Sequence, residues 1–247
     1  MVDSGFYNMD CMDGMKQFPD KYFDLAIVDP PYGDGGAHGS DKTRAGSAEC
    51  STVIDHLHSS QRKREREREK VARTGGPWAS KFGKKIISWD TAPEQDYFQE
   101  LFRVSRNQII WGGNYFNLPP TRCFLIWRKT NVPEKFSMAM CEYAWTSFND
   151  NAKMFEYSAV GQKGRFHPTQ KPVELYKWIL SNYAQHGDKI LDTHVGSASS
   201  LIACRESGFQ YVGFEIDEGY FKMAQKRLQA VEAQMNIFDY AFNPYQE

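Results

Sequence analysis

The chain has 247 residues, of which 41% are hydrophobic and 25% charged, values typical of one globular α/β domain with a sizeable core. No apolar stretch approaches the roughly 20 residues that span a bilayer, which argues against an integral membrane protein. Residues 1–10 lack the basic flank and apolar core of a secretion signal, so we expect a cytoplasmic protein with no membrane partner.

The cysteines and the charges narrow the class further. Five cysteines are widely spaced, with no CxxC pair and no zinc-ligand spacing, so we expect neither a disulfide framework nor a metal. The net charge is −1, but the charges are unevenly distributed along the chain. Residues 61–85 contain ten Lys and Arg residues and three Glu residues. Such a basic element on an otherwise acidic chain is compatible with contact to phosphates.

The N-terminal part predicts a short strand at 6–10, a short helix or turn at 12–18 and a second strand that ends in Asp29-Pro30-Pro31-Tyr32. The run Leu25–Val28 is continuously apolar, which is typical of a strand buried on both faces of a parallel sheet. Proline cannot continue a strand ladder, so we expect the tetrapeptide at the carboxyl end of this strand.

Residues 33–85 differ in character, with a glycine-rich start and the charged run QRKREREREK. We expect a mobile insertion within a single domain of residues 1–247. Opposite charges three residues apart allow a helix over 61–72, either as a solvated surface helix or as an arm that contacts DNA. The second alternative assigns DNA binding to Arg62, Lys63, Arg64, Arg66, Arg68, Lys81, Lys84 and Lys85.

The remainder alternates between helical and strand patterns. Helices are expected at 93–105, 172–183, 197–208 and 218–235, and strands at 107–116, 122–129, 140–148, 188–192 and 211–217. This alternation predicts a doubly wound α/β fold, a largely parallel sheet with helices on both faces.

The tetrapeptide after the second strand offers a specific chemistry. An aromatic amino group is a poor nucleophile, because its lone pair is delocalised into the ring. The Asp29 carboxylate and the Pro30 carbonyl are suited to accept both amino hydrogens, while Pro30 and Pro31 fix the backbone in advance. Tyr32 offers a face for an extruded base. The alternative is a turn that only ends the strand.

A second pattern lies at residues 191–200, where an apolar strand runs into a small-residue turn and a helix. Small residues let a ligand approach the backbone, and the helix N-terminus offers free N–H groups. Glu215 closes the next strand, where an acid accepts hydrogen bonds from ribose hydroxyls. A complete GxGxxG is absent, which disfavours NAD. A third segment, residues 166–172 (FHPTQKP), is either part of a site or an ordinary helix entry.

In this order, DPPY, HPTQKP and ILDTHVGSAS with FEID resemble the β-group of DNA amino-methyltransferases. The resemblance implies a Rossmann-like methyltransferase fold with a mixed seven-stranded sheet and a circularly permuted motif order. It also implies S-adenosylmethionine as methyl donor and a base flipped out of double-stranded DNA. The cofactor residues that it implies are Asp10, Cys11, Asp29, His167, Thr169, Lys171, Asp192, Gly196, Ser197, Glu215 and Ile216.

Two departures from the family pattern matter. The usual turn is close to DPFxGSGTT, whereas Thr193 and His194 replace Pro-Phe here and Ala198 replaces the second glycine. His194 either packs where the aromatic ring would or takes part in proton transfer. Residues 147–165 are too few for a large recognition domain, so recognition falls to the 33–85 insertion or to a second subunit, with a homodimer as one option.

Asp29, where other members carry serine, favours adenine N6 over cytosine N4 as the target, and no Pro-Cys dipeptide supports cytosine C5 chemistry. The alternatives are a cytosine-N4 enzyme, an RNA or protein-glutamine methyltransferase, and a non-catalytic cofactor- or DNA-binding subunit.

Overall fold

The computed structural model describes residues 4–33, 91–133, 139–159, 165–167 and 169–242. The chain divides into two compact units, one of residues 1–30 and 93–247 and one of residues 31–92. All the helices and strands named below belong to the first unit. No helix in the described ranges is long and apolar enough to cross a membrane.

Eight strands within the described ranges form one sheet in the order β1-β8-β7-β2-β3-β5-β4-β6. Strand β5 runs antiparallel to its neighbours β3 and β4, and the other pairs are parallel, so the predicted mixed sheet is confirmed. The strands are β1 (Gly5–Asn8), β2 (Phe23–Val28), β3 (Ser105–Trp111), β4 (Phe124–Lys129), β5 (Cys141–Thr146), β6 (Lys153–Tyr157), β7 (Lys189–Asp192) and β8 (Gln210–Glu215).

The predicted count of seven strands is wrong by one. The additional strand is β6, in a stretch that the sequence analysis treated as a connection. It lies at the edge of the sheet, pairs only with β4, and leaves Met154 57% exposed. An edge strand with little burial needs no continuous apolar run, and its pattern is therefore weak in the sequence.

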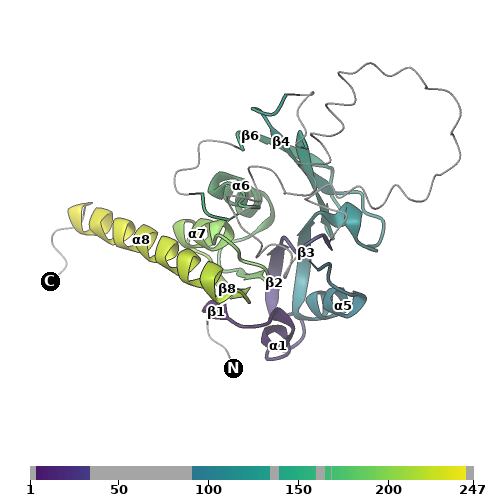
Figure 1. Ribbon diagram of the computed structural model, residues 1–247, viewed down its shortest axis with the longest axis horizontal. Helices are drawn as coiled ribbons and strands as arrows, with labels where there is room; N and C mark the ends of the chain where they lie inside the picture. The colour runs from purple at the N-terminus through teal and green to yellow at the C-terminus, as the bar shows by residue number, and fades with distance from the viewer. Residues whose placement is uncertain (1–3, 34–90, 134–138, 160–164, 168, 243–247) are drawn as a thin grey trace, which may run out of the picture. The chain divides into compact units, whose positions relative to one another are not determined.

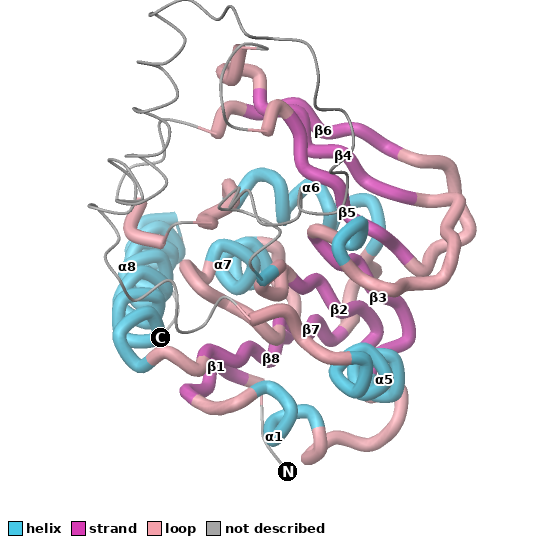
Figure 2. The backbone as a smooth tube through the Cα atoms, turned by 45° about the vertical axis from the view of Figure 1, so that its right-hand side comes forward, coloured by secondary structure: helices cyan, strands magenta, loops and turns pink. Residues whose placement is uncertain are grey.

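Strand β2 is buried on both faces, as its apolar run predicts. Leu25 and Ile27 belong to one core with α6 (Val173–Tyr183) and α7 (Ser199–Glu206). Ala26 and Val28 belong to the opposite core with α1 (Cys11–Met15) and α5 (Gln95–Val104). These helix pairs lie on opposite sides of the strands (Figures 1 and 2). The long helix α8 (Glu218–Phe242) packs against α7.

Strands β1, β2, β7 and β8 run in the same direction, so their carboxyl ends all lie on the same side of the sheet. The register pairs Asn8 with Glu215 and Asp192 with Gly213, and β2 lies parallel between β7 and β3. Ligands of open α/β sheets bind outside the carboxyl ends of the strands. The fold therefore brings Asp29 and Pro30, which follow β2, and the small-residue turn after β7 to the same ends of the strands.

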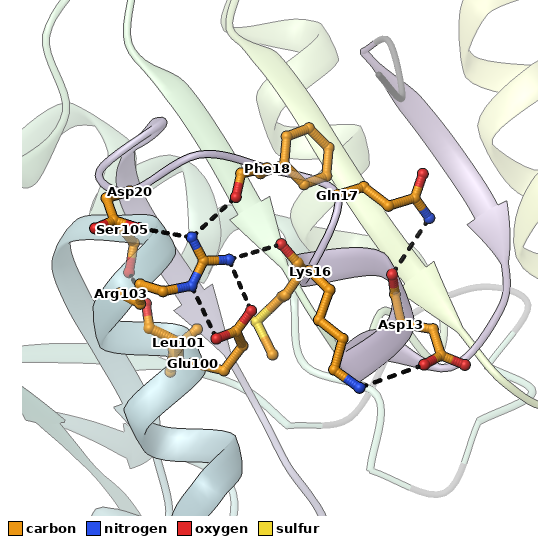
Figure 3. A network of polar contacts seen from close by, with 10 residues as sticks. Asp13, Lys16, Gln17, Phe18, Asp20, Glu100, Leu101, Arg103 and Ser105 are labelled. Carbon is orange, nitrogen blue, oxygen red and sulfur yellow. Dashed lines mark hydrogen bonds and ion pairs between the residues drawn. The ribbon is translucent and has the colours of Figure 1, made fainter.

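Arg103 at the end of α5 ties this helix to the segment after α1 (Figure 3). Its guanidinium donates two hydrogen bonds to Glu100 and one to Asp20, and it also donates to the carbonyls of Met15 and Phe18. All five N–H donors are thus used, which only the planar fork of arginine allows.

We predict that Arg103→Lys lowers the free energy of unfolding by about 1–3 kcal/mol, because lysine replaces few of these charge-assisted bonds. Urea titration followed by circular dichroism measures the change. Arg128→Lys is the matched control: Arg128 pairs with Glu156, and both side chains are at least half exposed. An equal loss in both variants would contradict a clamp at Arg103.

Candidate active site

Asp29 and Pro30 directly follow β2 at the carboxyl edge of the sheet. Pro30 is buried, and the Asp29 side chain is only 13% exposed. The Asp29 carboxylate accepts a hydrogen bond from Nζ of Lys171, which comes from the segment before α6. The structure thus brings the predicted catalytic acid into direct contact with a residue predicted for the cofactor pocket.

Lys171 is almost fully buried between two carboxylates. Its Nζ lies 3.2 Å from Oε2 of Glu142 and 5.2 Å from the ring centroid of Trp111. Glu142 is also 2.7 Å from Nζ of Lys129. Burial lowers the pKa of Lys171, but Asp29 and Glu142 outweigh it and hold that pKa above its usual range. Likewise, burial raises the pKa of Glu142, but the two lysines hold it below its usual range.

Asp192 ends β7 and organises the turn that follows it. It accepts a hydrogen bond from the Ser200 hydroxyl and another, 3.0 Å long, from the His194 N–H. Burial raises the pKa of Asp192 to about 7, although both hydrogen bonds favour its charged form. The carboxylate therefore holds the two ends of the turn together.

Glu215 ends β8 and binds the same turn from the next strand. Its carboxylate accepts 2.9 Å hydrogen bonds from the N–H groups of Gly196 and Asp217. Burial raises the pKa of Glu215 above its usual range, against these two bonds. From β1, the Asn8 amide donates to the carbonyls of Glu215 and Ile216, at 2.8 and 3.2 Å, and fixes the backbone there.

The turn is strained at Ala198, which has the left-handed dihedrals φ 60° and ψ 24°. This is the position at which the family pattern carries its second glycine, a residue without the Cβ penalty. The Ser197 carbonyl accepts a 2.7 Å hydrogen bond from Arg227 of α8, which also donates to Ser199. Helix packing and these bonds hold the alanine in the conformation that glycine adopts more easily.

The HPTQKP segment divides between two parts of the site. His167 packs edge-on against Tyr220, with ring centroids 4.4 Å apart, and lies 3.2 Å from the Thr169 hydroxyl. A Cβ at Gly196 would meet the His167 ring at 3.2 Å, so this end of the segment lies against the turn. Burial, reinforced by Lys171, lowers the pKa of His167 to about 3. Lys171, at the other end, reaches Asp29.

Asp10 and Cys11 lie at the start of α1, next to the end of β1. The Asp10 carboxylate caps the helix by accepting a 2.8 Å hydrogen bond from the Met12 N–H, and the residue is exposed. Burial, reinforced by Asp10, raises the pKa of Cys11 to about 12, so the thiol is neutral. Both residues are near the β8 end, because β1 pairs with β8.

His194 packs edge-on against Tyr97, with ring centroids 5.4 Å apart, in agreement with the packing alternative. The Thr193 hydroxyl lies 2.6 Å from the Tyr97 hydroxyl and 2.9 Å from Nδ1 of His194. Burial lowers the pKa of His194 to about 4, against the influence of Asp10. The two departures from the Pro-Phe pattern thus form one buried hydrogen-bonded chain.

The other predicted residues are not tested by this geometry. Pro31 and Tyr32 begin the second unit, and the structure does not place the two units relative to each other. The predicted DNA-binding residues lie outside the described residues: Arg62, Lys63, Arg64, Arg66, Arg68, Lys81, Lys84 and Lys85.

The sequence analysis did not identify Glu142, Asn8 or Tyr97 as parts of the site. The sequence signal for Glu142 was an acidic residue inside an otherwise apolar strand pattern. Its pairing with the buried Lys171 and Lys129 explains why an acid lies there. Asn8 and Tyr97 carried no signal, because their partners lie far away in the chain.

The carboxyl ends of β7 and β8 fit a nucleoside-containing ligand. Glu215 keeps lone pairs for ribose hydroxyls beyond its two backbone bonds. Ile216, the next residue, is 63% exposed despite its apolar side chain, and so offers a face for an aromatic base. Asp192 and Gly196 bring a small-residue turn to the same edge.

Comparison with known proteins agrees with this geometry. A family model described as DNA methylase matches residues 23–226. The type II methyltransferase M2.DpnII of Streptococcus pneumoniae is 27% identical over 225 residues, which cover 84% of this chain and 82% of that protein.

Two solved structures share the fold. The M1.HpyAVI–SAM complex has a TM-score of 0.50 at 18% identity and covers 90% of this chain and 98% of that one. The PvuII DNA methyltransferase (cytosine-N4-specific) has a TM-score of 0.53 at 10% identity and covers 94% of this chain and 92% of that one.

We predict that His194→Phe weakens the loss of stability on acidification. The unfolded chain protonates this histidine near pH 6.5 and the folded chain only near pH 4, so the contribution of His194 to stability falls as the pH drops between these values. Phenylalanine cannot titrate, and the slope of unfolding free energy against pH should fall by up to about 1.4 kcal/mol per pH unit.

Urea titrations at several pH values between 4 and 7 measure this slope. The exposed His186→Phe is the matched control. A slope in His194→Phe identical to wild type would mean that His194 binds its proton equally well in the folded and unfolded chain.

Proposed function

Because the chain belongs to the DNA methylase family, whose model spans residues 23–226, we propose that it transfers a methyl group from S-adenosylmethionine to adenine N6 in DNA. As a member of this family, the protein is an amino-methyltransferase of DNA bases. The choice of adenine N6 over cytosine N4 is the part that we propose. The observation that carries the proposal is the Asp29 carboxylate, held by Lys171 at the sheet edge where β7 and β8 also end.

The reaction requires an amino nitrogen with an available lone pair. Asp29 accepts one amino hydrogen and the Pro30 carbonyl accepts the other, which draws the nitrogen toward tetrahedral geometry. Both acceptors sit on backbone fixed by proline and by a buried strand, so little reorganisation is needed during reaction. The tyrosine of the tetrapeptide, Tyr32, stacks on the flipped base.

When bound, S-adenosylmethionine supplies an electrophilic methyl group on a sulfonium. The relative M1.HpyAVI is described as a SAM complex, which supports the same cofactor here. Glu215 would accept hydrogen bonds from the ribose hydroxyls, and the exposed Ile216 would offer an apolar contact to the adenine. Asp192 and Gly196 shape a turn that would hold the rest of the cofactor, and His167, which lies against this turn, and Thr169 beside it would line the same pocket.

An aspartate at position 29 supports adenine as the target. Cytosine N4 is the second candidate, because the PvuII methyltransferase, described as cytosine-N4-specific, has the same fold.

The basic stretch of residues 61–85 supplies phosphate contacts that a protein of net charge −1 otherwise lacks.

We expect the purified protein to label mixed-sequence DNA with methyl groups from labelled S-adenosylmethionine. Nucleoside digestion and chromatography should then give N6-methyldeoxyadenosine. Label in N4-methyldeoxycytidine would select the second candidate, and label in RNA alone would reject a DNA substrate.

Asp29→Ala should lower the rate of methyl transfer by at least about a thousandfold, because a preorganised acceptor is lost. S-adenosylmethionine affinity, measured by calorimetry, should stay within a few-fold. Asp150→Ala, at an exposed acid after β5, is the control and should leave both unchanged. Substantial activity in Asp29→Ala would contradict the catalytic role of Asp29.

Replacing Arg64, Arg66 and Arg68 together by Ala should weaken DNA binding and reduce the slope of log K against log salt by about 1–3, because each lost phosphate contact contributes about 0.9. The control replaces Arg128, Lys153 and Lys222, whose side chains are 58%, 35% and 67% exposed. Equal slopes in the triple variant and wild type would remove the charged run from the DNA interface.

A further inference from the structure

We infer that Lys171 is a positioning residue for Asp29, and that Glu142 and Lys129 complete a charge chain that holds the Asp29 carboxylate in the orientation needed to accept an amino hydrogen. This inference rests on the proposed function, since it concerns the acid that we assign to amino-group activation. It gives Lys171 a role toward the catalytic acid, whereas the family resemblance places it in the cofactor pocket.

The geometry of the chain is continuous. Lys171 donates to Asp29 and lies 3.2 Å from Glu142, which in turn lies 2.7 Å from Lys129. The side chains of Lys171 and Lys129 are only 3% and 8% exposed. The carboxylates of Asp29 and Glu142 are 13% and 27% exposed, so two largely buried cations alternate with two anions and the four charges balance.

Such a chain is costly unless every member is paired. Removing one partner of a buried ion pair leaves an uncompensated charge, a much larger effect than the net contribution of the pair. A simple strand-ending turn at Asp29 needs no buried lysine. A carboxylate that must accept an amino hydrogen does benefit, because a nearby cation favours the charged form and the hydrogen bond fixes its orientation.

The position of Lys171 in the chain also fits this role. Four residues earlier, His167 lies against the Gly196 turn, and one residue later Pro172 caps α6. The short segment therefore connects the turn assigned to the cofactor with the acid assigned to the base. Trp111, fully buried with its ring 5.2 Å from Nζ of Lys171, closes the side toward β3.

Other titratable groups act on this chain from the surrounding elements. Burial raises the pKa values of Asp192 on β7, Tyr97 on α5 and Tyr176 on α6, and the negative charge of Asp29 adds to the rise. Burial lowers the pKa of His167, and the positive charge of Lys171 lowers it further. Burial also lowers the pKa of Arg165, and the negative charge of Glu142 opposes that effect. Among these neighbours, Lys171 is the cation that contacts Asp29 directly.

The test compares the pH dependence of kcat in Lys171→Gln and Glu142→Gln. Without the cation, the acid limb of the profile in Lys171→Gln should move up by at least about one pH unit, because a nearby cation favours the charged form of a carboxylate. Glu142→Gln removes an anion that competes with Asp29 for Lys171. The acid limb of the kcat profile in this variant should therefore move down by about half a pH unit. A merely structural role would not produce shifts of opposite sign.

S-adenosylmethionine affinity should stay within about threefold in both variants, and Lys177→Gln, at a half-exposed lysine paired with Glu206, is the control. A tenfold loss of affinity in Lys171→Gln with an unshifted profile would make Lys171 a cofactor ligand and overturn the inference. If Lys171→Gln fails to fold, Glu142→Gln decides, and an unshifted profile there overturns it. Activity in Asp29→Ala would instead overturn the proposed function.

Discussion

The site depends on one buried interaction, the ion pair between Lys171 and Asp29. Two charges out of water are tolerated only when hydrogen bonds and further charges compensate for lost hydration. Here Glu142 and Lys129 provide that compensation. The pair therefore constrains the segment before α6, because Lys171 must reach both the end of β2 and Glu142 on β5, which in turn contacts Lys129 of β4.

The cofactor half of the site uses carboxylates in a different way. Asp192 and Glu215 end adjacent strands, and each binds backbone N–H groups of the turn between β7 and α7. Burial raises the pKa of both acids, and the backbone bonds oppose that rise. Asp29 pairs with a cation, whereas Asp192 and Glu215 organise backbone. This difference suits the proposed roles of Asp29 in amino-group activation and of the other two acids in cofactor binding.

The departures from the family turn are accommodated locally. Ala198 adopts a left-handed conformation that normally favours glycine, and it is held there by a buried methyl group and by packing against α8. His194 and Thr193 replace Pro-Phe with a hydrogen-bonded chain to Tyr97. The turn keeps its shape because side chains from α5 and α8 supply the support that the altered sequence gives up.

The elements that carry the motifs could be derived from the sequence, because hydrophobic periodicity and proline act locally. The strand before Asp29, the small-residue turn and Glu215 at the end of its strand were all predictable on that basis. Strand β6 was missed, since an exposed edge strand has a weak pattern. The partners of Lys171 emerged only from the folded arrangement, because Asp29 follows β2 and Glu142 lies on β5, strands that are distant in the chain and have β3 between them in the sheet.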